Sequence, residues 1–139
     1  MAAITACGSI LAGCGGGGPT SPSDVGASLP TLTATRTNGV LTLTIDASSP
    51  LATVGGMALV QSSSGSFLVG RTSQDACTVL TSVCTHQQCT VSNMSSGIYV
   101  CPCHGSEFDT TGRVVRGPAG SPLRQFASTL ANGVLTISA

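Results

Sequence analysis

Two short segments decide how this chain is interpreted: Cys84-Thr85-His86-Gln87-Gln88-Cys89 and Cys101-Pro102-Cys103-His104-Gly105-Ser106. Each segment offers a cysteine and a histidine at short spacing, as Cys84-x-His86 and as Cys101-x-x-His104. The chain has 2 histidines, and both lie in these segments. Two thiolates and two imidazoles make a complete tetrahedral donor set for a metal. The sequence therefore predicts a metal centre that is built from two loops.

Two kinds of centre use this donor set. One is a structural zinc ion held by two cysteines and two histidines. The other is a 2Fe-2S cluster in which cysteines hold one iron and histidines the other. Cys89 and Cys103 favour the cluster, because a zinc site does not need them. A disulfide between them would hold the two loops of a cluster site together and contribute about 2–4 kcal/mol of stability. A metal-free disulfide scaffold is a third alternative, but it leaves both histidines unexplained.

Composition and charge exclude one class of partner. The chain has 139 residues, which favours a single domain, and it has 5 basic and 5 acidic residues with no formal net charge. Neutrality argues against nucleic acid as a partner, because binding to phosphates needs a basic surface. Charged residues make up only 7% of the chain, against the usual quarter or so for a soluble domain. We therefore expect a surface of serine, threonine, glycine and glutamine.

The remaining pattern is one of short strands and tight turns. Asn38-Gly39 and Asn132-Gly133 each stand between alternating apolar and polar runs, which is the strongest short-range signal for a β-hairpin. No segment of about ten residues carries a helical apolar period without a glycine or proline break. The pattern predicts an all-β chain folded as an antiparallel sandwich or barrel.

The two segments resemble the paired loop motifs C-T-H-x-x-C and C-P-C-H-G-S of Rieske iron–sulfur proteins. The resemblance is to the high-potential type with a disulfide, as in cytochrome bc complexes and arsenite oxidase small subunits. It extends from about residue 52 to residue 138 and includes Gly117-Pro118-Ala119, which resembles the loop that covers the cluster. It implies an antiparallel β-sandwich with a small cluster-binding subdomain, which we expect over residues 31–139.

The resemblance also implies a role for each motif residue. Cys84 and Cys101 are expected to bind the inner iron of a Rieske 2Fe-2S cluster, and His86 and His104 the outer iron. Cys89 and Cys103 are expected to form the disulfide. The hydroxyl of Ser106 is expected to donate a hydrogen bond to a bridging sulfide.

Three positions depart from the family pattern. Gln87 and Gln88 stand where quinol-oxidising members usually carry leucine and glycine. Phe108 stands where the family has a tyrosine whose hydroxyl bonds a ligand sulfur. The loss of that donor is expected to lower the reduction potential, because hydrogen bonds to the sulfurs stabilise the more negative reduced cluster.

The N-terminus resembles that of bacterial lipoproteins. Leu11-Ala12-Gly13-Cys14 is similar to a lipobox, so residues 1–14 are expected to be a signal remnant that ends at a lipidated Cys14. Residues 15–30 are rich in glycine, proline and serine and are expected to be a flexible tether. The alternative is an unmodified glycine-rich tail. The lipoprotein interpretation predicts a periplasmic or extracytoplasmic protein that a lipid at Cys14 tethers to the membrane.

Together these features predict an exported one-electron carrier in a respiratory or periplasmic chain, rather than an enzyme by itself. The expected partners are a c-type cytochrome, a cytochrome b complex or a large oxidoreductase subunit, with quinol as a further reactant. The alternatives are a Rieske subunit of a quinol-oxidising cytochrome bc-type complex and a subunit of a periplasmic molybdenum oxidoreductase. A zinc-binding structural module is the alternative from a different class.

Overall fold

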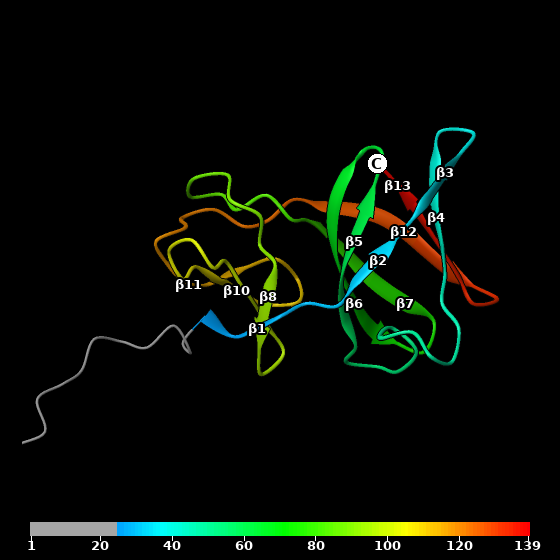
Figure 1. The fold of residues 1–139 in the computed structure, drawn as a ribbon, viewed down its shortest axis with the longest axis horizontal. Coiled ribbons are helices and arrows are strands. Elements are labelled where there is room, and N and C mark those ends of the chain that lie inside the picture. Colours follow the sequence, from blue (N-terminus) through cyan, green and yellow to red (C-terminus); the bar gives the residue numbers. More distant parts are fainter. Residues whose placement is uncertain (1–24) are drawn as a thin grey trace, which may run out of the picture.

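The structure is a computed structural model that describes residues 25–139. The predicted signal remnant, Cys14 and most of the predicted tether lie outside the described residues. Over the described range the chain forms β-strands joined by turns, without an α-helix, as the sequence predicted (Figure 1). Within that range no helix is long and apolar enough to cross a membrane.

The larger sheet has 8 strands in the order β2-β5-β6-β7-β12-β13-β4-β3. The chain passes directly from β2 to β3 through Ala34, whose N–H donates to the carbonyl of Gln61 over 2.8 Å. One continuous stretch therefore forms both edges, and the sheet closes on itself. The strands are β2 (Thr31–Thr33), β3 (Thr35–Thr37), β4 (Val40–Thr44), β5 (Met57–Ser62), β6 (Gly65–Ser73), β7 (Ala76–Thr81), β12 (Gln125–Ala131) and β13 (Val134–Ser138).

The two Asn-Gly pairs form the hairpin turns that the sequence predicted. Asn38 and Gly39 have φ values of 51° and 82°, and they join β3 to β4. Asn132 and Gly133 have φ values of 51° and 73°, and they join β12 to β13. Positive φ at both central residues matches the twist of the flanking strands, and asparagine and glycine tolerate it best. Local turn chemistry therefore fixes the register of both hairpins.

The smaller sheet has 5 strands in the order β1-β8-β9-β10-β11 and lies beside the larger one (Figure 1). It begins earlier than the domain start predicted at residue 31. Ala27 and Ser28 pair with β8, and Leu29 is buried, so residues 27–29 belong to the fold rather than to the tether. The strands are β1 (Ala27–Ser28), β8 (Asn93–Ser95), β9 (Ile98–Val100), β10 (Glu107–Phe108) and β11 (Val114–Arg116).

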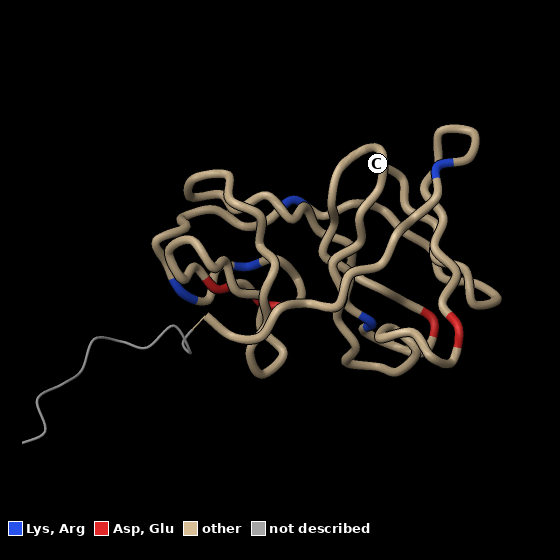
Figure 2. The backbone as a smooth tube through the Cα atoms, viewed as in Figure 1, with Lys and Arg blue, Asp and Glu red and all other residues tan. Residues whose placement is uncertain are grey.

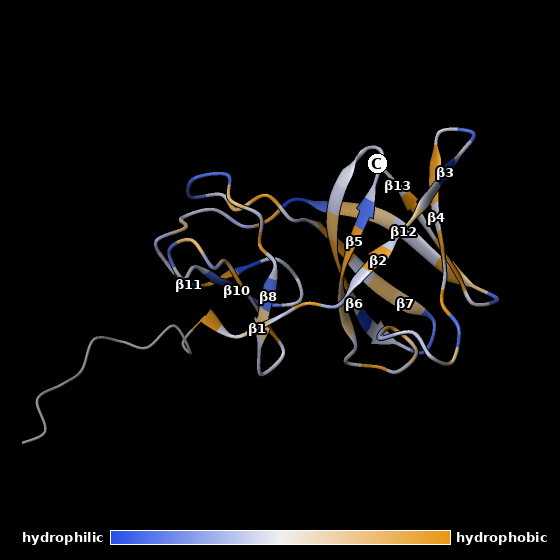
Figure 3. Ribbon diagram, in the orientation of Figure 1, coloured by the Kyte–Doolittle hydropathy of each residue, from blue (hydrophilic) through white to orange (hydrophobic). Residues whose placement is uncertain are grey.

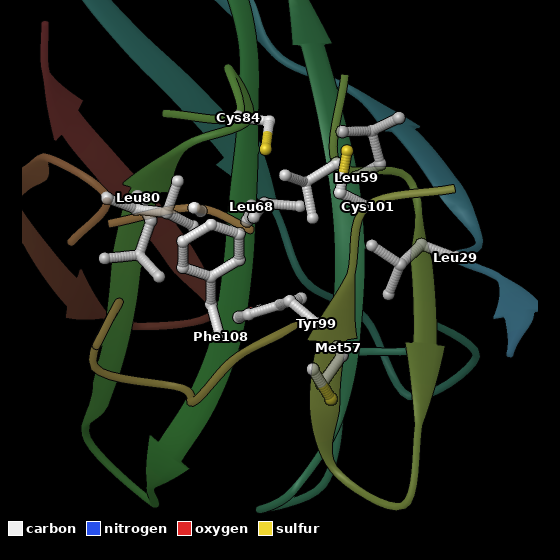
Figure 4. Close-up of a cluster of buried hydrophobic side chains, with 12 residues drawn as sticks. Leu29, Met57, Leu59, Leu68, Leu80, Cys84, Tyr99, Cys101 and Phe108 are labelled. Carbon is white, nitrogen blue, oxygen red and sulfur yellow. The ribbon is translucent and has the colours of Figure 1, made fainter. Parts of the chain in front are cut away.

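Consecutive residues of β5, β6 and β7 are buried on both faces of the sheet, which explains the short apolar stretches within these strands (Figure 3). Because side chains alternate across a strand, Ala58 and Val60 enter the interior of the closed sheet, whereas Met57 and Leu59 face the other way. The outward face is covered by the smaller sheet and its loops. The resulting second core supports the candidate site (Figure 4).

Candidate metal centre

Each motif forms a short loop that folds back on its own first cysteine. The N–H of Cys84 donates to the carbonyl of Cys89 over 2.7 Å, and its carbonyl accepts from the N–H of Gln88 over 3.0 Å. The second loop repeats this arrangement. There, the N–H of Cys101 donates to the carbonyl of Ser106 over 2.8 Å, and its carbonyl accepts from Gly105 over 2.9 Å. The first loop links β7 to β8, and the second links β9 to β10.

A disulfide joins the two loops. Cys89 and Cys103 are bonded, with their Cα atoms 6.4 Å apart, and this confirms the predicted pairing. The sulfur of Cys101 lies within 4.8 Å of both of these sulfurs. Because the other two are bonded to each other, Cys101 is the member of this group that keeps a free thiol.

The two free cysteines of the motifs are buried. Cys84 and Cys101 are each 1% exposed, and both sulfurs lie at one edge of the second core (Figure 4). Burial raises the pKa of the Cys101 thiol, and the neighbouring Cys84 thiol raises it further, whereas backbone N–H groups of Cys103 and His104 lower it. The two loops therefore present both free thiols at the same edge of the core.

The two histidines lie on the solvent side of the same loops. His86 and His104 are exposed, and their ring centroids are 5.0 Å apart with an angle of 86° between the ring planes. The site therefore has two layers, with sulfur donors below and imidazole donors at the surface. A cluster with one thiolate-bound and one imidazole-bound iron needs this division of ligands.

A third loop, residues 117–122, is hydrogen-bonded to both motif loops. The N–H of Ala119 donates to the hydroxyl oxygen of buried Ser106 over 3.0 Å, which leaves the Ser106 hydroxyl hydrogen free to donate elsewhere. The hydroxyl of Thr85 donates to the carbonyl of Ser121 over 2.7 Å. The role of Thr85 was missed from sequence, because its partner lies 36 residues away. No local pattern signals such a contact.

Two buried aromatic residues, Tyr99 and Phe108, lie beneath the site and show the effect of a phenylalanine where the family has a tyrosine. Phe108 and Tyr99 are both fully buried and lie opposite each other on β10 and β9. The Phe108 ring points toward the edge of the core where Cys84 lies (Figure 4). The Tyr99 hydroxyl has no hydrogen-bond partner among the described residues and packs against Gly70 instead. Burial raises the pKa of Tyr99. Neither ring therefore supplies a hydroxyl to a sulfur.

Comparison with known proteins establishes the family. The model of the Rieske 2Fe-2S domain matches residues 43–127, and the chain belongs to this family. It is similar to cytochrome b6-f complex iron-sulfur subunits, with 37% identity over 115 residues in Prochlorococcus marinus (strain NATL1A) and 50% over 52 residues in Synechococcus elongatus. These alignments cover 78% and 37% of this chain.

A solved structure supports the same assignment. The cyanobacterial plasma membrane Rieske protein from Synechocystis PCC 6803 is 31% identical and superposes with a TM-score of 0.54, over 60% of this chain and 87% of that one. The chain spans 55% of the Prochlorococcus subunit and 29% of the Synechococcus subunit. The predicted family, fold class and cofactor are confirmed: the chain is a Rieske domain of the kind that holds a 2Fe-2S cluster.

Phe108→Tyr is expected to raise the midpoint potential of the cluster by about 60 mV, the equivalent of about 1.4 kcal/mol for one electron. The new hydroxyl would stand at the tip of a ring that already points toward Cys84, and its hydrogen bond would stabilise the reduced state (Figure 4). Tyr99→Phe is the matched control, because the hydroxyl that it removes has no partner. Redox titration measures both variants, and equal midpoints for Phe108→Tyr and the parent would contradict this role.

Ser106→Ala is expected to lower the midpoint potential, also by about 60 mV, because the free hydroxyl hydrogen is the proposed donor to a bridging sulfide. The substitution also removes the acceptor for the buried N–H of Ala119, which should cost about 1–3 kcal/mol of stability. Redox titration and thermal melting separate the two effects. A lower melting temperature with an unchanged midpoint would leave Ser106 a structural role alone.

Gln88→Gly is expected to stabilise the fold by about 1 kcal/mol, because Gln88 has a φ of 59° and a left-handed conformation is costly for any residue with a Cβ atom. Gln87 is the control, since it is exposed like Gln88 but does not have a positive φ. Gln87→Gly should lower stability by about 0.5–1 kcal/mol. Thermal melting should therefore move in opposite directions for the two variants, and a decrease for both would refute the strain.

Proposed function

We propose that Cys84 and Cys101 hold one iron of the cluster and that His86 and His104 hold the other. The observation that carries this assignment is the two-layered geometry, with two neighbouring buried thiols beneath two exposed imidazole rings whose centroids are 5.0 Å apart. Cys89 and Cys103 are committed to the disulfide and are therefore not ligands. Cys77, the remaining free cysteine of the described chain, lies on β7 outside both loops.

The bound cluster supplies a site that accepts and releases one electron. The chain positions and insulates that site. Burial of Cys84 and Cys101 keeps water from the sulfur side, whereas exposure of His86 and His104 gives a partner access to the other side. Replacing two thiolates by neutral imidazoles makes the centre less negative, which favours a potential of roughly −150 to +300 mV.

We propose that the protein works as an exported one-electron carrier, tethered through a lipid at Cys14, between a donor and a c-type cytochrome or similar acceptor. The disulfide supports an oxidising compartment, because cytosolic thiols are kept reduced. The name of the Synechocystis neighbour, a plasma membrane Rieske protein, agrees with a place at a membrane.

Membership of a quinol-oxidising complex is the second candidate function. It rests on the relatives named cytochrome b6-f complex iron-sulfur subunits. The exposed amide of Gln87 weighs against it, since quinol-oxidising members usually carry leucine there. Co-purification with a cytochrome b from native membranes would favour this candidate, and isolation without one would favour the independent carrier.

The deciding experiment is electron paramagnetic resonance of the purified protein after reduction with ascorbate. A Rieske-type signal at this stage is expected, because ascorbate reduces clusters of high potential. A signal that requires dithionite would keep the cluster but move the protein to a low-potential pathway. Silence with both reductants, together with zinc in the metal analysis, would overturn the electron-carrier function.

A further inference from the structure

A groove of about 440 Å³ runs beside the candidate centre and extends beyond the proposed ligands. The first motif loop forms one wall, through Cys84 and Gln88, and the third loop forms another, through Pro122. Val83 and Phe126 also line the groove, and Val83 is 47% exposed. The groove thus combines apolar surface with direct contact to one of the two buried cysteines.

Arg124 lines the same groove and is exposed to solvent. Its guanidinium carbon lies 4.8 Å from the centre of the Phe126 ring, and it makes no ion pair or side-chain hydrogen bond within residues 25–139. Three of the other four arginines have polar partners. Arg71 donates to three backbone carbonyls, Arg116 lies 4.0 Å from Glu107, and Arg36 donates to Ser64.

The groove has no negative charge to balance Arg124. None of its lining residues is acidic, and charged positions are sparse along the described backbone (Figure 2). An unpaired cation on an apolar floor is complementary to a carboxylate that is flanked by apolar side chains. Exposed large apolar residues are few in the described chain, and Val83 is the one that lines this groove.

We infer that this groove is a docking surface for the electron-transfer partner, which inserts a carboxylate and a neighbouring apolar side chain against Arg124, Val83 and Phe126. The inference rests on the proposed function, because it places the partner against Cys84, one of the assigned ligands. The partner would then contact this groove as well as the exposed histidines. Its own surface would carry an acidic side chain beside an apolar one. Ionic strength should weaken the contact, since Arg124 is exposed to solvent.

The test is calorimetric titration of the oxidised holoprotein with an acidic c-type cytochrome at low salt, with a basic c-type cytochrome as the probe of opposite charge. Arg124→Glu is expected to weaken binding of the acidic cytochrome by roughly tenfold. Arg36→Glu is the matched control, because it makes the same charge change on β3, outside the groove, and it should stay within about twofold of the parent. Val83→Ser should weaken binding of the acidic cytochrome without a change of charge.

The docking surface would be overturned by equal effects of Arg124→Glu and Arg36→Glu, or by a parent protein that does not bind the acidic cytochrome. Preferential binding of the basic cytochrome would do so as well. Calorimetry measures binding without electron transfer, so a failure of the docking surface can be distinguished from a failure of the proposed function. A parent protein without a Rieske signal would overturn the proposed function. Variants that all keep a normal Rieske signal and an unchanged affinity for the acidic cytochrome would overturn the docking surface alone.

Discussion

Cys101→Ala is expected to abolish the 2Fe-2S cluster, with loss of bound iron, of the visible absorption and of the Rieske signal after reduction. Cys101 is 1% exposed, has the Cys84 thiol as a neighbour and lies beside the disulfide, so its sulfur faces the space between the two motif loops. An alanine there offers no ligand atom. The cluster would lose one of two thiolates on the inner iron, and no other free thiol is within reach, because Cys89 and Cys103 are bonded to each other.

Cys77→Ala is the matched control for this prediction. Cys77 is also a free cysteine, but it lies on β7 and packs against the core of the larger sheet. It lies outside both motif loops and outside the group of sulfurs formed by Cys89, Cys101 and Cys103. Iron content and the Rieske signal should therefore match those of the parent. The dispersion of proton resonances establishes whether Cys101→Ala remains folded, and a folded variant that keeps a normal cluster would refute the assignment.

The parts of the fold that depend on local chemistry were predictable from sequence. Asn38-Gly39 and Asn132-Gly133 carry their own conformational preference, so both hairpins followed from neighbouring residues alone. The motif loops were predictable for a similar reason, since each is closed by hydrogen bonds between residues four or five positions apart. The pairing of Cys89 with Cys103 came from family resemblance, and the structure confirms it.

Other features arise from contacts between distant segments, and no local pattern encodes them. The strand at Ala27–Ser28 exists because β8 offers it an edge and because Leu29 reaches the second core, so composition alone suggested a tether. The bond from Thr85 to Ser121 likewise needs the folded chain. The unpartnered hydroxyl of Tyr99 shows the same limit, since a sequence displays a tyrosine but not the direction in which its ring points.

Removal of the disulfide is expected to cost about 3 kcal/mol of stability and to shorten the lifetime of the cluster. The bond closes a loop with a sequence separation of 14, and a loop of that size restricts the unfolded chain by about this amount. It also joins the two motif loops directly, whereas their other links run through hydrogen bonds to the third loop, so its loss lets them separate and exposes the ligands to water. Thermal melting and the decay of visible absorption at raised temperature measure the two effects.

The single variant Cys89→Ser has a complication that the double variant Cys89→Ser/Cys103→Ser avoids. In the single variant the freed sulfur of Cys103 stays within reach of Cys101, because the three sulfurs lie within 4.8 Å of one another, and an incorrect disulfide between them would remove a ligand. A similar loss in both variants would show that the missing staple is the cause. A much larger loss in the single variant would identify mispairing, and a cluster lifetime equal to that of the parent in the double variant would show that the bond does not stabilise the site.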